Sequence, residues 1–165
     1  MFSVGDLVVH PMHGAGVIDA IVREKVAGST QDYYVFKMPV GGLLLKIPTA
    51  NSQAIGIRSI IQRPEAEALI AAIPSMPVEE NSNWNKRYRE NMARLKSGDL
   101  YEVARVIKGL LYRERRRGLS NGERKMLHSA KQILVSELVL AEDSGYEEVE
   151  KRVERAMFQS PVSPG

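Results

Sequence analysis

The chain has 165 residues, a formal net charge of +3 and no cysteine, which excludes a disulfide framework and a thiolate metal site or nucleophile. Charged residues make up 26% and apolar residues 44%, the balance of a folded protein rather than a disordered one. The N-terminus lacks a signal sequence and no apolar run approaches the roughly 20 residues of a membrane span, so we expect a cytoplasmic protein without a membrane partner.

Residues 1–61 alternate between short apolar runs and turns rich in glycine and proline. The runs predict strands at 7–9, 16–23, 33–38, 43–47 and 55–61, with turns at 27–31 and 39–42. Strands of this length and spacing indicate a small antiparallel barrel or a strongly bent sheet. A unit of about 60 residues buries only about 60% of its unfolded surface. We therefore expect this domain to be marginally stable alone and to be stabilised by contact with a partner.

Helical periodicity replaces the strand pattern after residue 61. A proline at the first turn predicts a short helix over 64–73, within a connecting segment at 62–81. The next helix contains the only tryptophan of the chain, is capped by Ser82 or Asn83, and ends near residue 98.

Three further helices complete the expected helical domain, residues 82–158. The first spans 99–117 and carries one apolar stripe. Ser120 with Glu123, and Ser144 with Glu147, have the spacing of capping boxes that start the other two. Residues 159–165 are expected to form a flexible tail. The predicted fold class is α+β, with a small antiparallel β domain followed by a compact helical bundle.

The positive charge is concentrated in one part of the chain. Residues 82–132 carry a net charge of +9, between segments 61–81 at −3 and 133–165 at −4. Such a local field attracts polyanions, although a solvated helical surface is the alternative explanation.

No pattern of residues indicates an active site. His10 and His13 have the H-x-x-H spacing, but they lie in a predicted turn without an obvious third ligand. Gly14-Ala15-Gly16 leads into a predicted strand and not a helix, so the phosphate-loop mechanism is absent. We therefore expect neither an enzyme nor a bound metal or cofactor.

Trp84 stands at the start of its helix, beside Lys86, Arg87 and Arg89. An apolar ring among cations can press on a base step while the cations hold phosphates. The alternative is that Trp84 belongs to the core, because an apolar stripe at helical spacing follows it, namely Tyr88, Met92 and Leu95.

A second basic cluster surrounds the turn between residues 117 and 120. Arg116 and Arg117 end one predicted helix, and Arg124 and Lys125 lie across the turn. Cations at a helix C-terminus complement the helix dipole, which can explain part of this cluster. Its size also suits a second phosphate-contacting patch, and Lys46 on a predicted strand is a further basic candidate.

Several segments together resemble the CarD/CdnL family of bacterial transcription regulators. The resemblance covers residues 2–157 and rests on VGDLVVHPMHGAGVI, LLLKIP, NWNKRYREN, RERRRGLSNGERKML and AKQILVSELVLAE. The NWNKRY and GLSNGE segments are the most specific. The N-terminal part alone is also similar to the polymerase-interacting module of the transcription-repair coupling factor.

The resemblance implies a Tudor-like domain at residues 1–61 that docks on the β subunit of RNA polymerase, with Lys46 at a basic position of the docking face. Arg23 and Lys25, which flank Glu24, are expected to bind polymerase as well. It implies a helical domain that meets promoter DNA at the upstream edge of the −10 bubble. There the tryptophan would be a minor-groove wedge that stabilises the open complex, with Lys86, Arg87 and Arg89 on the DNA backbone. Glu24 departs from the family, since relatives can carry arginine there.

The resulting hypothesis is a non-enzymatic transcription regulator, monomeric and associated with the nucleoid through polymerase. One alternative is an architectural protein that binds duplex DNA without polymerase. Another is a protein–protein adaptor in which Trp84 is a core residue.

Overall fold

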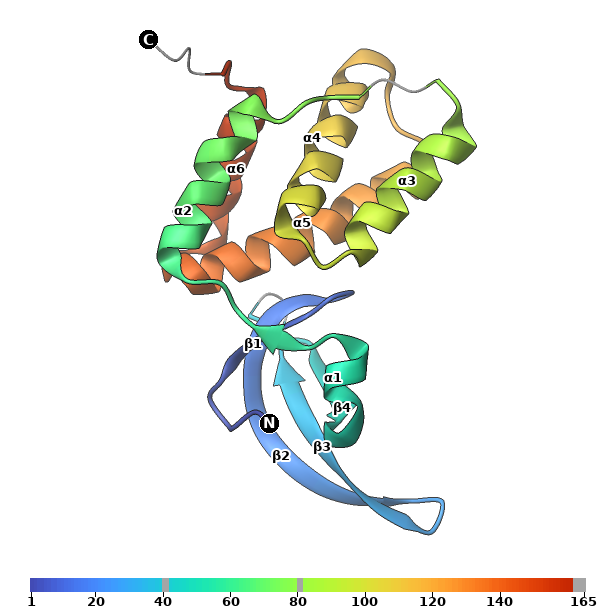
Figure 1. The fold of residues 1–165 in the computed structure, drawn as a ribbon, viewed down its shortest axis with the longest axis vertical. Coiled ribbons are helices and arrows are strands. Elements are labelled where there is room, and N and C mark those ends of the chain that lie inside the picture. Colours follow the sequence, from blue (N-terminus) through green and yellow to red (C-terminus); the bar gives the residue numbers. More distant parts are fainter. Residues whose placement is uncertain (40–41, 80–81, 162–165) are drawn as a thin grey trace.

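The computed structural model describes residues 1–39, 42–79 and 82–161. The N-terminal part forms one antiparallel five-stranded sheet with the order β4-β3-β2-β1-β5 (Figure 1). Its strands are β1 Leu7–His10, β2 Gly14–Val26, β3 Ser29–Lys37, β4 Leu44–Pro48 and β5 Arg58–Ser59. Residues 40–41 of the predicted turn at 39–42, residues 80–81 of the expected connecting segment and residues 162–165 of the expected tail lie outside the described residues.

The sheet bends around its own small core. The core consists of Val8, Ile18, Tyr34, Phe36, Met38, Ile47 and Ile57. Beyond Ile18 the side chains of β2 lose their burial, while β2 and β3 stay paired from Val22↔Tyr33 to Val26↔Ser29. The two strands therefore project from the core as a hairpin arm, defined here as residues 22–33, which extends away from the helices (Figure 1).

The predicted fifth strand over residues 55–61 is wrong in extent. The chain instead forms a 3₁₀ turn at Thr49–Asn51 and a short helix, α1, at Ser52–Ile55. After the turn at Gly56, Ile57 enters the β core, Arg58 and Ser59 pair with β1, and the backbone N–H of Ile60 donates to the Leu7 carbonyl. The chain then leaves the sheet for the helical domain, so the strand ends at Ser59 and does not reach residue 61.

Five longer helices build the second domain: α2 Arg63–Ala72, α3 Trp84–Lys96, α4 Leu100–Arg117, α5 Asn121–Glu142 and α6 Tyr146–Phe158. Ala66, Leu69 and Ile73 place α2 and the 3₁₀ turn Ile73–Ser75 in the same core as α4, α5 and α6. The expected α+β arrangement of a β domain followed by a helical bundle is confirmed.

Helix caps confirm most of the predicted boundaries. The side chain of Asn83 accepts from the backbone N–H of Lys86, and Ser120 with Glu123 forms the predicted capping box of α5. The second predicted box, Ser144 with Glu147, is wrong. Helix α5 runs on to Glu142, α6 starts from Gly145 without a side-chain cap, and the Ser144 hydroxyl donates to the Glu142 carbonyl.

Helix α5 also joins the two domains. The backbone N–H of Ala15 donates to Ser136 Oγ at 2.8 Å. The Arg58 guanidinium donates two hydrogen bonds of 2.8 Å to the carboxylate of Glu137, which is fully buried and also accepts from the backbone N–H of Ile61. Because Glu137 loses these partners if the domains separate, the junction resists independent motion of the two domains.

Candidate nucleic-acid interface

Trp84 is the first residue of α3 and remains 42% exposed. Its indole stacks on the Tyr88 ring, with centroids 5.0 Å apart and planes 18° from parallel. The indole Nε1–H donates to the Ser120 hydroxyl at 3.2 Å. A Cβ added at Gly122 would lie 3.9 Å from Cζ2 of the same ring. Contacts from α3 and α5 thus hold the ring in place while leaving part of it open to solvent.

The apolar stripe of α3 changes from core to surface along the helix. Leu95 is buried, Met92 and Tyr88 are half-buried, and Trp84 is exposed. The helix therefore packs through its C-terminal end and presents the tryptophan at its free N-terminal end. The alternative interpretation, in which Trp84 is a core residue, is wrong.

The three cations that follow Trp84 do not share one face. Lys86 is exposed and lies 4.0 Å from Glu90, and Arg89 is exposed as well. Arg87 is buried, and its Nε donates to Glu123 Oε2 at 3.0 Å. Arg89 follows Arg87 by two positions, about 200° around a helix, so the two side chains must leave in different directions. The structure therefore brings Lys86 and Arg89 to the surface and directs Arg87 towards α5.

Glu123 connects α3, α4 and α5 at this point. Besides Arg87, its carboxylate accepts from the Ser120 hydroxyl at 3.1 Å and lies 3.8 Å from the Arg113 Nε. Burial disfavours the charged carboxylate, but the hydrogen bonds from Arg87 and Ser120 outweigh it and hold the pKa of Glu123 below its ordinary value. The carboxylate is thus kept ionised at the base of the tryptophan site.

Ser120 and Glu123 are site residues that sequence reasoning missed. Their spacing predicted a capping box, and the structure adds a second role to it. The hydroxyl that accepts from the backbone N–H of Glu123 also accepts from the Trp84 indole. No local pattern signals this contact, because Trp84 and Ser120 lie 36 positions apart in the sequence.

The second predicted basic cluster surrounds the same corner. Arg116 and Arg117 are exposed in the last turn of α4, and Arg124 and Lys125 are exposed in the first turn of α5. Since Trp84 contacts Ser120 between these two turns, the fold brings the tryptophan together with both parts of the cluster. We name this surface, made of Trp84 and these four cations, the basic corner.

The three basic residues predicted to bind polymerase lie in the β domain. Arg23 and Lys25 are exposed on the hairpin arm, and the Arg23 Nε lies 2.9 Å from Asp32 Oδ1. Lys46 is on β4 and donates to the carboxylate of Glu24. The charge of the Glu24 carboxylate therefore offsets that of Lys46.

Strand β4 is one edge of the sheet, so its outer backbone groups have no strand partner among the described residues. The apolar side chains of Leu43 and Leu44 are exposed beside this edge. An exposed edge with apolar side chains is a surface on which another chain can add a strand.

The described residues contain no group of three or more His, Cys, Asp or Glu side chains placed to hold a metal. His10 and His13 do lie together, with ring centroids 4.5 Å apart, and burial lowers the pKa of His10. In residues 1–39, 42–79 and 82–161 no helix is long and apolar enough to cross a membrane.

Comparisons with known proteins match both halves of the chain. The sequence model described as "CarD, C-terminal domain" matches residues 68–154, and that described as "CarD-like/TRCF RID domain" matches residues 2–61. A Bacillus subtilis (strain 168) protein named "Putative transcription factor YdeB" is 32% identical over 138 residues, covering 84% of this chain and 90% of that protein. The solution NMR structure of the 72-residue N-terminal domain of Myxococcus xanthus CarD is 30% identical, with a TM-score of 0.32, over 36% of this chain and 79% of that one.

Proposed function

The chain belongs to the CarD family of transcription regulators, and from this premise we propose that it docks on the β subunit of RNA polymerase and stabilises the promoter open complex. The helical domain meets promoter DNA at the upstream edge of the −10 bubble. Trp84 acts there as a minor-groove wedge, without catalysis and without a cofactor. The protein works as a monomer in the cytoplasm, associated with the nucleoid through polymerase.

The observation that carries this proposal is the exposed but braced ring of Trp84 at the basic corner. Contacts with Tyr88 and Ser120 hold the Trp84 ring in place, so the side chain loses little conformational freedom when it inserts into DNA. Apolar wedges in basic surroundings unstack a base step at a cost of about a few kcal/mol. The exposed cations Lys86, Arg89 and Lys125 can offset part of that cost by neutralising phosphates.

Weak contacts are sufficient for this function. Each 1.4 kcal/mol changes an equilibrium about tenfold, so a modest gain in DNA contact shifts the open fraction by one or two decades. Docking on polymerase also raises the effective concentration of the wedge at the promoter. The hydrogen-bonded junction at Glu137 supports a mechanism in which the β domain docks and the helical domain contacts DNA, because the junction keeps the wedge at a fixed position relative to the β domain.

The β domain offers the docking surface. We propose that the β subunit adds along the exposed edge of β4, where Leu43 and Leu44 supply apolar contacts. Lys46 on the same strand, with Arg23 and Lys25 on the arm, adds positive charge around this edge. Charges at the rim of an interface mainly speed association and select the partner.

The test is the lifetime of open complexes formed by the cognate polymerase, with wild type and with Trp84→Ala. The matched control is Tyr101→Ala, which removes an aromatic side chain of similar exposure from the first turn of α4. We expect wild type and Tyr101→Ala to lengthen the lifetime and Trp84→Ala to lose most of the effect while still binding polymerase. Equal lifetimes for all three proteins would exclude the wedge.

The basic corner also favours a second function, polymerase-independent binding of duplex DNA. Arg117, Arg124 and Lys125 are exposed around one turn, as such binding requires. In that case the chain alone binds duplex DNA strongly, and its affinity falls steeply as salt is raised. If the chain binds promoter DNA at physiological salt only when polymerase is present, this second function is rejected.

A further inference from the structure

A cavity of about 250 Å³ lies between α3 and α4 and is lined along one side by residues 77–79 and Ser82. Pockets for drug-sized ligands usually enclose about 300–1,000 Å³, so this cavity suits a smaller molecule. Six arginines line it, two from α3 and four from α4: Arg87, Arg94, Arg105, Arg113, Arg116 and Arg117. We name it the α3–α4 pocket.

Arginine is the commonest residue of the described lining, whose described acidic residues are Glu79 and Glu90. Glu102 and Glu123 pair with arginines of the pocket from outside the described lining. The arginines bring several guanidinium groups to one small cavity, and guanidinium groups bind carboxylate and phosphate anions.

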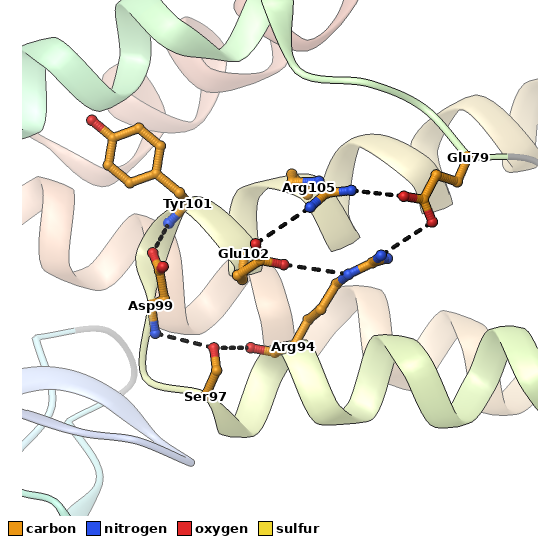
Figure 2. A network of polar contacts seen from close by, with 7 residues as sticks. All are labelled: Glu79, Arg94, Ser97, Asp99, Tyr101, Glu102 and Arg105. Carbon is orange, nitrogen blue, oxygen red and sulfur yellow. Dashed lines mark hydrogen bonds and ion pairs between the residues drawn. The ribbon is translucent and has the colours of Figure 1, made fainter.

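The carboxylate of Glu79 lies between two of the arginines (Figure 2). Its Oε2 is 3.1 Å from Arg94 Nη2, and its Oε1 is 2.9 Å from Arg105 Nη2. The hydrogen bond and charge of Arg94, with a contribution from Arg105, lower the pKa of Glu79, so it is an anion at neutral pH. Because the Glu79 side chain is 53% exposed and comes from a segment outside the helices, a ligand can replace it without opening the core.

Two donors of the pocket arginines lack a hydrogen-bond partner among the described residues. They are the Nε atoms of Arg105 and Arg113, and both are buried. The Arg113 Nε faces Glu123 at 3.8 Å, and the Glu79 carboxylate supplies only two oxygens for the guanidiniums of Arg94 and Arg105. A phosphate group supplies more acceptor oxygens and more charge in a similar volume, and it matches the planar fork of arginine.

We propose that the α3–α4 pocket binds a phosphate-bearing anion, which takes the place of the Glu79 carboxylate between Arg94 and Arg105. This proposal goes beyond the proposed function, because it requires neither polymerase nor the Trp84 wedge. The phosphate can come from a small molecule such as a diphosphate, or from a DNA backbone that reaches the pocket past Arg116 and Arg117.

The first experiment is calorimetric titration of the full-length protein with inorganic pyrophosphate, in a chloride buffer of constant ionic strength. We compare wild type with Glu79→Gln, which removes the competing charge, and with Glu67→Gln. Glu67 is a matched control, since it is equally exposed and also pairs with an arginine, Arg152, outside the pocket. We expect pyrophosphate to bind Glu79→Gln about three- to tenfold more tightly than wild type, with no change for Glu67→Gln.

A second pair of variants tests the arginines. Arg105→Gln should abolish saturable binding, whereas Arg152→Gln should leave it unchanged, with circular dichroism confirming that both variants are folded. The proposal is overturned if neither wild type nor Glu79→Gln binds pyrophosphate saturably. It is equally overturned if Glu79→Gln and Glu67→Gln tighten binding alike, because the effect is then general electrostatics.

The source of the phosphate follows from a competition experiment with fluorescently labelled duplex DNA. If pyrophosphate displaces the duplex and Arg105→Gln weakens binding of both, the pocket holds a phosphate of the DNA backbone. If pyrophosphate binds while duplex binding is unchanged by Arg105→Gln, the pocket holds a free small anion. Both outcomes support a phosphate site and assign its ligand.

Discussion

Arg87 and Glu123 form a buried ion pair, in which Arg87 Nε lies 3.0 Å from Glu123 Oε2, and this pair fixes the tryptophan helix to the start of α5. Their side chains are 10% and 3% exposed. Glu123 accepts in turn from Ser120, whose hydroxyl accepts from the Trp84 indole. Arg87 therefore helps to position Trp84 through this network.

The first prediction contrasts Arg87→Ala with Arg89→Ala. Removing Arg87 leaves the Glu123 carboxylate buried without its main partner, so we expect a loss of about 3–5 kcal/mol in the free energy of unfolding. Arg89 is exposed, and its removal should change stability by no more than about 0.5 kcal/mol. Urea unfolding followed by circular dichroism measures both. Equal losses would show that the Arg87–Glu123 pair contributes nothing particular.

The separation of Arg87 from Lys86 and Arg89 could not have been predicted from the sequence. Helical spacing shows that the three side chains point in different directions, but not which direction faces the protein. That depends on Glu123, which is 36 positions away from Arg87 and packs against α3 only in the folded domain. The exposure of Trp84 was predictable in part, because an asparagine cap and a polar segment precede it.

Local sequence signals correctly predicted where two of the helices start. Asn83 caps α3 and Ser120 caps α5, since both have short polar side chains ahead of a periodic apolar run. The errors at Ser144 and in the fifth strand have another origin. Where α5 ends and where the chain leaves the sheet are decided by packing between distant elements, which a local pattern does not contain.

The second prediction concerns how the stability of wild type and of Glu123→Gln changes as the pH is lowered. The pKa of Glu123 is lowered in the folded protein, so its carboxylate contributes stability that is present above its unfolded pKa, near 4.5, and is lost as the pH falls through the lower folded pKa. We expect wild type to be more stable than Glu123→Gln near neutral pH. The difference should shrink below about pH 4.5, as protonated Glu123 comes to resemble glutamine.

Urea unfolding of the two proteins between about pH 7 and pH 3 checks this prediction. Comparing them removes the effect of other carboxylates that titrate in the same range. Glu79 also has a lowered pKa, whereas burial and the neighbouring Glu67 raise the pKa of Glu142, so the two act in opposite directions. A stability difference that stays constant with pH would contradict the assignment of the shift to Glu123.

The third prediction tests the junction between the domains with Gly14→Ala and Gly28→Ala. Both glycines have positive φ, 93° and 83°, so alanine is strained by about 1–2 kcal/mol at either position. A Cβ at Gly14 would also lie 2.4 Å from Ser136 Oγ, whereas a Cβ at Gly28 meets nothing within 4 Å. We expect Gly14→Ala to cost about 1–3 kcal/mol more than Gly28→Ala, because α5 must move away from β2.

Urea unfolding gives the free-energy difference, and small-angle X-ray scattering at low urea tests whether the domains separate. Gly28→Ala is the control for backbone strain, since its turn lies at the tip of the hairpin arm. If the two substitutions cost the same, the approach of Gly14 to Ser136 does not hold the domains together.

The last prediction concerns Glu24 and its ion-pair partner Lys46. Their charges offset each other on the surface through which we propose that the β domain docks. Glu24→Gln releases Lys46, so we expect the β subunit of polymerase to bind about two- to fivefold more tightly, as the removal of one exposed ion pair allows. The gain should shrink as salt is raised, because both side chains are about half exposed and screened.

Glu65→Gln, an equal charge change on the exposed face of α2, is the control for net charge in the same surface plasmon resonance assay. Tighter binding by both variants would reflect net charge alone, and weaker binding by Glu24→Gln would mean that polymerase contacts the Glu24 carboxylate itself.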